Sequence, residues 1–152
     1  MLIKTHLAIT AFAVLAFISS AEHKLVFSLV AMASAFIPDI DSRFSVIGRP
    51  KIARILQFFT KHRGITHSFT FLLMASVPLA LFFPVIALPF FLGYGLHLFA
   101  DSLTKDGIIP FYPYRKKSSW IIRTGGRTEA ALFVFFIIGS LFLIVGKIGG
   151  LF

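Results

Sequence analysis

The histidine and acidic side chains of this chain gather where its apolar runs meet its basic loops. Eight of them lie at or near such a border, and none lies in the middle of an apolar run. Imidazole nitrogens and carboxylate oxygens are ligands that zinc and related metals take in proteins. If the runs cross a membrane alternately up and down, all eight groups reach the same membrane edge. The candidate ligands are His6, Asp39, Asp41, His62, His67, His97, Asp101 and Glu129.

Two pairs of these candidates have spacings that suit metal binding. His97 and Asp101 are four residues apart, so they share a helix face and can address one ion. Asp39 and Asp41 follow a proline, and two close carboxylates repel each other unless a cation or a proton lies between them. Each pair also has an ordinary interpretation, as a His–Asp hydrogen bond or as helix-capping aspartates in a solvated loop beside Arg43.

The segment 62–68 (HRGITHS) carries the most specific pattern in the chain. It supplies two imidazoles, from His62 and His67, on either side of Gly64, where the backbone can bend. Arg63 is a candidate phosphate clamp because a guanidinium binds phosphate oxygens through two parallel hydrogen bonds. The ordinary interpretation is a basic loop in which both histidines are solvated.

Two further candidates, His6 and Glu129, also have ordinary explanations when taken singly. A Glu in a first helical turn is stabilised by the helix dipole, and His6 could be an interfacial residue. Taken together, the candidates exceed one tetrahedral site and suggest two metal ions, an arrangement that serves hydrolysis at phosphoryl or acyl centres. We expect catalytic roles for Glu129 and Asp41 in proton transfer and for Arg63 on phosphate.

The composition of the chain predicts a membrane protein, and we expect it to be a multi-pass protein of the cell (inner) membrane. Of its 152 residues 57% are hydrophobic and only 14% charged, and the apolar residues form long blocks. The net charge of +9 does not require a nucleic-acid partner, because the cations fall mainly in two loops between apolar runs, as the positive-inside rule predicts. The chain has no cysteine, which excludes disulfides and thiolate ligands.

The apolar runs predict a single all-α domain over residues 1–152, a bundle of about five spans. The block 68–100 would be about 50 Å long as one helix, too long for one crossing, so we expect it to split near Phe83–Pro84. This hairpin places the basic loops 42–64 and 105–128 on one side, the cytoplasm, with the N-terminus in and the C-terminus out. The other runs are 7–21, 25–37 and 130–145.

Two short segments have separate interpretations. Residues 1–21 resemble a secretory signal peptide, whose cleavage would remove His6. Residues 50–59 carry apolar positions at helical spacing after Pro50, which predicts a short helix in the membrane interface or one packed on the spans. His23 is expected at the opposite membrane edge and is left out of the site.

The chain resembles the YdjM family of membrane-bound metal-dependent hydrolases. The resemblance covers nearly the whole chain and rests on the motifs TH at 5–6, PDID at 38–41, HRGITHS at 62–68 and HLFAD at 97–101. Residues 103–104, 107 and 111–113 are similar to the downstream segment of that family, and Glu129 lies near its closing motif. The family is similar, more distantly, to zinc-dependent phospholipase C and single-strand nucleases, which implies phosphoester hydrolysis by analogy.

These features favour a membrane-embedded, metal-dependent hydrolase of a lipid or lipid-linked phosphate. Zinc is the expected ion, with manganese or magnesium as alternatives and two ions as a further option. The primary ligands are expected to be Asp39, His67, His97 and Asp101. Two other functions stay open: a non-catalytic protein whose metal joins helix ends or whose basic loops recruit a partner, and a metal-ion or proton transporter. The uncharged middle of every run argues against transport.

Overall fold

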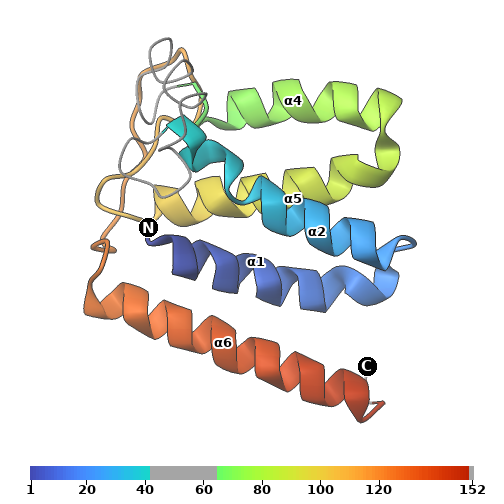
Figure 1. Ribbon diagram of the computed structural model, residues 1–152. Coiled ribbons are helices and arrows are strands. Elements are labelled where there is room, and N and C mark those ends of the chain that lie inside the picture. Colours follow the sequence, from blue (N-terminus) through green and yellow to red (C-terminus); the bar gives the residue numbers. More distant parts are fainter. Residues whose placement is uncertain (42–64, 151–152) are drawn as a thin grey trace.

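The protein is a bundle of helices that alternate in direction, so that one end of the bundle collects the starts of some helices and the ends of others (Figure 1). The computed structural model describes residues 1–41 and 65–150. This part of the chain contains five α-helices and no β-strand, which confirms the all-α prediction. They are α1 Ile3–Phe17, α2 Lys24–Ser34, α4 Phe69–Phe82, α5 Pro84–Ser102 and α6 Arg127–Ile148, with the 3₁₀ turns η1 Ile18–Ser20 and η2 Ile37–Asp41.

Three of these helices are long and apolar enough to cross a membrane: α1 extended through η1, α5 and α6. The prediction of about five spans is therefore confirmed only in part. The α2 helix has 11 residues and α4 has 14, both short of the roughly 20 that a span requires. The reason lies at the helix ends: α2 stops at Ser34, before Pro38, and α4 is bounded by its cap Ser68 and by Phe83.

The predicted break in the block 68–100 is present. Helix α4 ends at Phe82, Phe83 leaves the helical region (φ −140°, ψ 61°), and Pro84 begins α5. Proline suits this first helical position because its missing N–H would have no partner there. The two helices then pack side by side as a hairpin (Figure 1), which rules out a single long crossing. The predicted interfacial helix at 50–59 lies outside the described residues.

Helices α2 and α5 pack so closely that their backbones touch. A Cβ atom on Gly93 would lie 2.0 Å from the carbonyl oxygen of Ala31 and 2.3 Å from Oγ of Ser34. Small residues at such crossings let helices approach each other in lipid, where apolar burial gives little driving force. This approach brings the end of α2 beside the last turns of α5.

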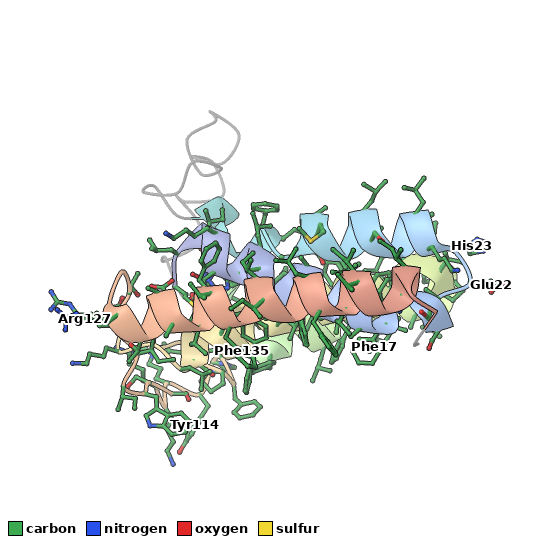
Figure 2. All side chains as sticks on the ribbon, turned by 90° about the horizontal axis from the view of Figure 1, so that it is seen from below. Phe17, Glu22, His23, Tyr114, Arg127 and Phe135 are labelled. Carbon is green, nitrogen blue, oxygen red and sulfur yellow. The ribbon has the colours of Figure 1, made fainter. Side chains whose placement is uncertain are left out.

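Helix α6 lies at the edge of the bundle and, among the described helices, packs on α1 alone. Figure 2 shows apolar side chains along its length, and most of them are exposed, as suits contact with lipid chains. Arg127 and Tyr114 lie at one end of the molecule, whereas Glu22 and His23 lie at the other (Figure 2). His23 is thus at the opposite end from the predicted site, as expected.

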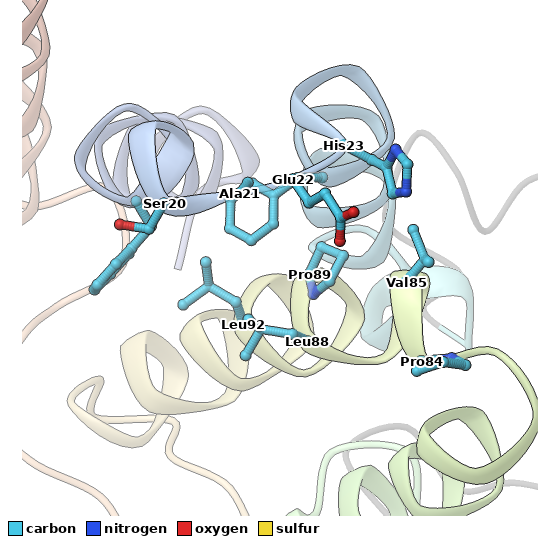
Figure 3. Close-up of a pocket in the computed structure, with 11 residues that line it drawn as sticks. Ser20, Ala21, Glu22, His23, Pro84, Val85, Leu88, Pro89 and Leu92 are labelled. Atoms are coloured by element: carbon cyan, nitrogen blue, oxygen red, sulfur yellow. The ribbon is translucent and has the colours of Figure 1, made fainter.

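A cavity of about 420 Å³ opens at that opposite end. It lies between the α1–α2 connection and the first turns of α5, with Pro89 and Leu92 among its mainly apolar lining residues (Figure 3). Glu22 and His23 provide the ionisable side chains at the cavity. The cavity is therefore separate from the candidate metal ligands, since none of them lines it.

Candidate metal centre

Five of the predicted ligands meet at the end of the bundle where α1 begins and α2 and α5 end. They come from four segments: His6 from α1, Asp39 from η2, His67 from the residues before α4, and His97 with Asp101 from α5. Burial is nearly complete, since no residue of this cluster except Asp39 is more than 2% exposed. Such burial of imidazoles and carboxylates is costly unless partners or ions compensate for the lost water.

Four of these side chains bring imidazole nitrogens close to carboxylate oxygens. Nε2 of His67 lies 3.6 Å from Oδ1 of Asp39 and 3.9 Å from Oδ2 of Asp101. Nε2 of His97 lies 3.7 Å from each of the same two oxygens. Ligands bound to zinc at about 2.0–2.1 Å in a tetrahedron lie about 3.3–3.4 Å apart, so these four nitrogen–oxygen distances are slightly longer than those around a bound zinc ion.

His6 approaches the other oxygen of Asp101. Its Nε2 lies 3.3 Å from Oδ1 of Asp101, and its ring stacks on that of His97 with centroids 3.9 Å apart and planes 9° apart. The amino group of Met1 also contacts Oδ1 of Asp101. Two ligand groups result, His6–His97–Asp101 and Asp39–His67–His97, and within each group the ligand atoms lie within 4.8 Å of one another.

A backbone carbonyl selects which nitrogen of His97 faces the cluster. Nδ1 of His97 lies 2.8 Å from the carbonyl oxygen of Ala35. Because a carbonyl can only accept a hydrogen bond, Nδ1 carries the proton and Nε2 keeps its lone pair for a ligand role. Nε2 of His97 is buried and has no hydrogen-bond partner within the described ranges. Buried polar atoms without partners are rare in proteins, and a metal ion would supply the missing interaction here.

His67 is held by the segment that precedes α4. Ser68 caps this helix by accepting a hydrogen bond from the Phe71 N–H at 3.2 Å, and its hydroxyl donates to the carbonyl of Ile65 at 2.5 Å. The hydroxyl of Tyr94 donates to the carbonyl of Thr66 at 2.5 Å and so ties the segment to α5. The position of His67 therefore depends on both α4 and α5.

Asp39 is the most accessible of the five, with 17% of its side chain exposed. Burial raises its pKa, but the hydrogen bond with His67 and the electrostatic effect of the neighbouring imidazoles outweigh burial and lower the pKa below its ordinary value. The carboxyl group is therefore ionised near neutral pH, which is the form that binds a metal ion.

The remaining candidates differ from these five. Glu129 is buried beside α1, but it belongs to neither ligand group in the described part of the chain. Its carboxylate accepts hydrogen bonds from the N–H groups of Leu2 and Gly125 and from the hydroxyl of Thr5. The side chains of Asp41, His62 and Arg63 lie outside what the structure describes, so their roles stay predictions.

Two contributors escaped the sequence analysis. The carbonyl of Ala35 has no side-chain signal, since every residue carries a carbonyl. Tyr94 was detectable in principle, because it lies one helical turn before His97 on α5 and a buried tyrosine hydroxyl requires a partner. Its place one turn away from a candidate ligand was the available signal.

Three long apolar helices and a buried histidine–aspartate cluster at one end define a multi-span membrane protein with a candidate metal centre. The chain belongs to the YdjM inner membrane protein family, whose family model matches residues 1–151. The resemblance seen in the sequence motifs is thereby confirmed, as is the predicted location in the inner membrane. Comparisons with curated proteins and with solved structures found no match.

Proposed function

We propose that the protein is a membrane-embedded, metal-dependent hydrolase of a phosphoester carried by a lipid or a lipid-linked phosphate. The observation that carries the proposal is the convergence of His67 Nε2 and His97 Nε2 on the same two carboxylate oxygens, at 3.6–3.9 Å. These atoms match the ligand set of zinc sites, and manganese or magnesium would favour the carboxylates.

In this proposal Asp39, His67, His97 and Asp101 hold the first ion. Among the described residues, His6 and the second oxygen of Asp101 are the ligands available for a second ion, while His62 and Asp41 stay predicted ligands. A divalent ion in such a site lowers the pKa of water and polarises a phosphoryl oxygen, which is the chemistry that hydrolysis requires.

The chain's own residues orient and insulate this site. The carbonyl of Ala35 keeps the proton on Nδ1 of His97, so that Nε2 remains a ligand. The buried cluster that contains Tyr94 and Leu98 adjoins the site, because these two residues flank His97 on α5. Arg63 as a phosphate clamp and Asp41 in proton transfer complete the proposal.

A lipid phosphate suits the depth of the cluster. The ligands lie at the ends of apolar helices, where phosphate headgroups lie in a bilayer, and not at the midplane. Asp39 is the partly exposed member of the cluster, so a substrate would approach from its side. The expected partners are therefore membrane lipids, and no nucleic acid is required.

A second function is supported by the burial of the ligands. Because the ligands come from four segments and most are at most 2% exposed, an ion there would join helix ends without any need for substrate access. This metal-stapled, non-catalytic protein would bind metal tightly and gain stability from it, yet show no turnover. Transport is less well supported, because ionisable residues in the three candidate spans lie near their ends.

Purified protein in detergent tests the proposal. Bound metal would be quantified, and release of phosphate or headgroup would be assayed on mixed lipids and on a phosphoester panel. We expect turnover that EDTA abolishes and that the His97→Ala/Asp101→Ala variant lacks, whereas His23→Ala, at the opposite end, retains it. Retained activity in the double variant would contradict the catalytic assignment, and tight metal binding without turnover would favour the stapled protein.

A further inference from the structure

The carboxylate of Glu129, at the start of α6, contacts the first turn of α1, although the two lie far apart in the sequence. Oε1 accepts hydrogen bonds from the Leu2 N–H at 2.6 Å and from the Thr5 hydroxyl at 2.9 Å. Oε2 accepts one from the Gly125 N–H at 2.5 Å. Both oxygens of this buried carboxylate are thus engaged, and the residue joins the first turn of α1 to the first turn of α6.

The carboxylate of Glu129 supplies the hydrogen-bond acceptor that the N-terminus of α1 lacks. The first N–H groups of a helix have no partner within the helix, and the cap residue of α1, Leu2, makes no side-chain cap hydrogen bond. A carboxylate is also favoured near helix N-termini because their dipoles are positive, and here two such termini meet. Hydrogen bonds to an ionised acceptor are stronger than neutral ones. Glu129 therefore caps α1 from a separate helix.

The first turn of α1 carries a member of the metal centre. Thr5, which donates to Glu129, directly precedes His6, whose Nε2 lies 3.3 Å from Asp101 and whose ring stacks on His97. A shift of this turn would move His6 away from both partners. Since α6 packs on no described helix except α1, the Glu129 contacts link α6 to the site through that helix.

We infer that Glu129 is a positioning residue that fixes the first turn of α1 so that His6 faces Asp101 and His97. This inference rests on the proposed metal site and deepens it, because it assigns Glu129 a role that acts through His6 and not on the ion. It also differs from the role expected from the sequence, in which Glu129 is a ligand or a proton-transfer group.

A double-mutant cycle with Co²⁺ as the probe tests the inference. We expect Glu129→Gln, which keeps the shape but removes the charge, to weaken binding of the second Co²⁺ ion, the one assigned to His6, about 10-fold, as is typical for residues that orient ligands. In a His6→Ala background the same change should weaken binding less than about 2-fold, because its effect passes through His6. The absorption bands of Co²⁺ at saturation should keep the wild-type shape in Glu129→Gln, since the ligand set is unchanged.

The control variants separate this role from others. Thr5→Val removes one donor to Glu129 without touching the carboxylate and should reproduce part of the loss. Glu22→Gln makes the same chemical change at the far end of α1 and should leave Co²⁺ binding unaltered. An equal loss from Glu129→Gln in both backgrounds, altered absorption bands, or no loss at all would overturn the inference.

A second measurement keeps the inference testable if the wild-type protein binds no Co²⁺, a result that would overturn the proposed function. Amide hydrogen exchange of residues 2–7 reports directly on the first turn of α1. We expect exchange there to accelerate at least about 10-fold in Glu129→Gln and to stay unchanged in Glu22→Gln, with or without metal. Unchanged exchange in Glu129→Gln would show that Glu129 does not hold this turn.

Discussion

The Nδ1 atom of His97 lies 2.8 Å from the carbonyl oxygen of Ala35, so the last turn of α2 orients a candidate ligand on α5. This relationship depends on how closely the two helices approach. Four residues before His97, Gly93 lies against the Ala31 carbonyl with no room for a side chain. The tautomer of His97 therefore depends on how closely α2 and α5 pack.

The first prediction concerns Gly93 and uses Gly95 as its control. A Cβ on Gly93 would lie 2.0 Å from the Ala31 oxygen, so Gly93→Ala should push α2 away from α5, break the His97–Ala35 contact and destabilise the protein by about 1–3 kcal/mol. A Cβ on Gly95 meets only Leu72 Cδ2, at 3.4 Å, so Gly95→Ala gains the same helix propensity without the clash. Thermal unfolding and a zinc titration compare the stability and the zinc affinity of the two variants. Equal behaviour of the two would contradict this account.

The second prediction concerns the hydroxyl of Tyr94. Tyr94→Phe removes its hydrogen bond to the Thr66 carbonyl, next to His67, while the ring still fills the core. We expect zinc affinity to fall by about 10-fold, because the contact holds the segment that carries a ligand. Tyr114→Phe, on an exposed loop residue, is the matched control and should change nothing. Unchanged affinity in Tyr94→Phe would show that this contact does not position His67.

The third prediction concerns the cap of α4. Ser68→Ala removes both the acceptor for the Phe71 N–H and the donor to Ile65, which should lower the free energy of unfolding by about 1 kcal/mol. Zinc affinity should fall as well, because Ser68 directly follows His67. Thermal unfolding and a zinc titration measure the two effects, with the exposed Ser119→Ala as control. A loss of stability without a loss of zinc affinity would show that the Ser68 cap does not position His67.

The fourth prediction concerns metal and stability. An ion that binds only the folded protein adds about 2.7 kcal/mol at 100 times its dissociation constant, so zinc should raise the melting temperature and EDTA should reverse the rise. The His67→Ala/His97→Ala variant should show no such rise. His23→Ala, which removes an imidazole at the opposite end, should respond as the wild type does. A zinc-dependent rise that survives in the double variant would mean that the ion binds elsewhere.

Much of this site followed from local patterns. His97 and Asp101 are four residues apart on one helix, and the break at Pro84 turns α5 back so that they return to the end of the bundle where His67 lies. Both features are visible in the sequence, because helical periodicity and proline act locally. The distribution of basic loops supplied the remaining constraint, that α4 and α5 form a hairpin.

Other features depend on tertiary packing and had no local signal. The short length of α2 was not predicted, because its apolar run continues past Ser34. The structure places the end of that run in the residues that connect α2 to η2 and in the first residue of η2, Ile37. The hydrogen bonds of Glu129 require knowledge that α6 packs on α1, which hydropathy does not encode. A first-turn Glu has the same sequence signature whether it binds a metal, caps its own helix or caps another.

The decisive measurement is whether zinc binds at the predicted ligands. It uses the anomalous scattering of a crystal of the purified protein, recorded on both sides of the zinc absorption edge. We expect a peak within bonding distance of His67 Nε2 and His97 Nε2 and of carboxylate oxygens from Asp39 and Asp101. A zinc-saturated crystal with no peak at these four side chains, or with its zinc bound at other residues, would contradict it.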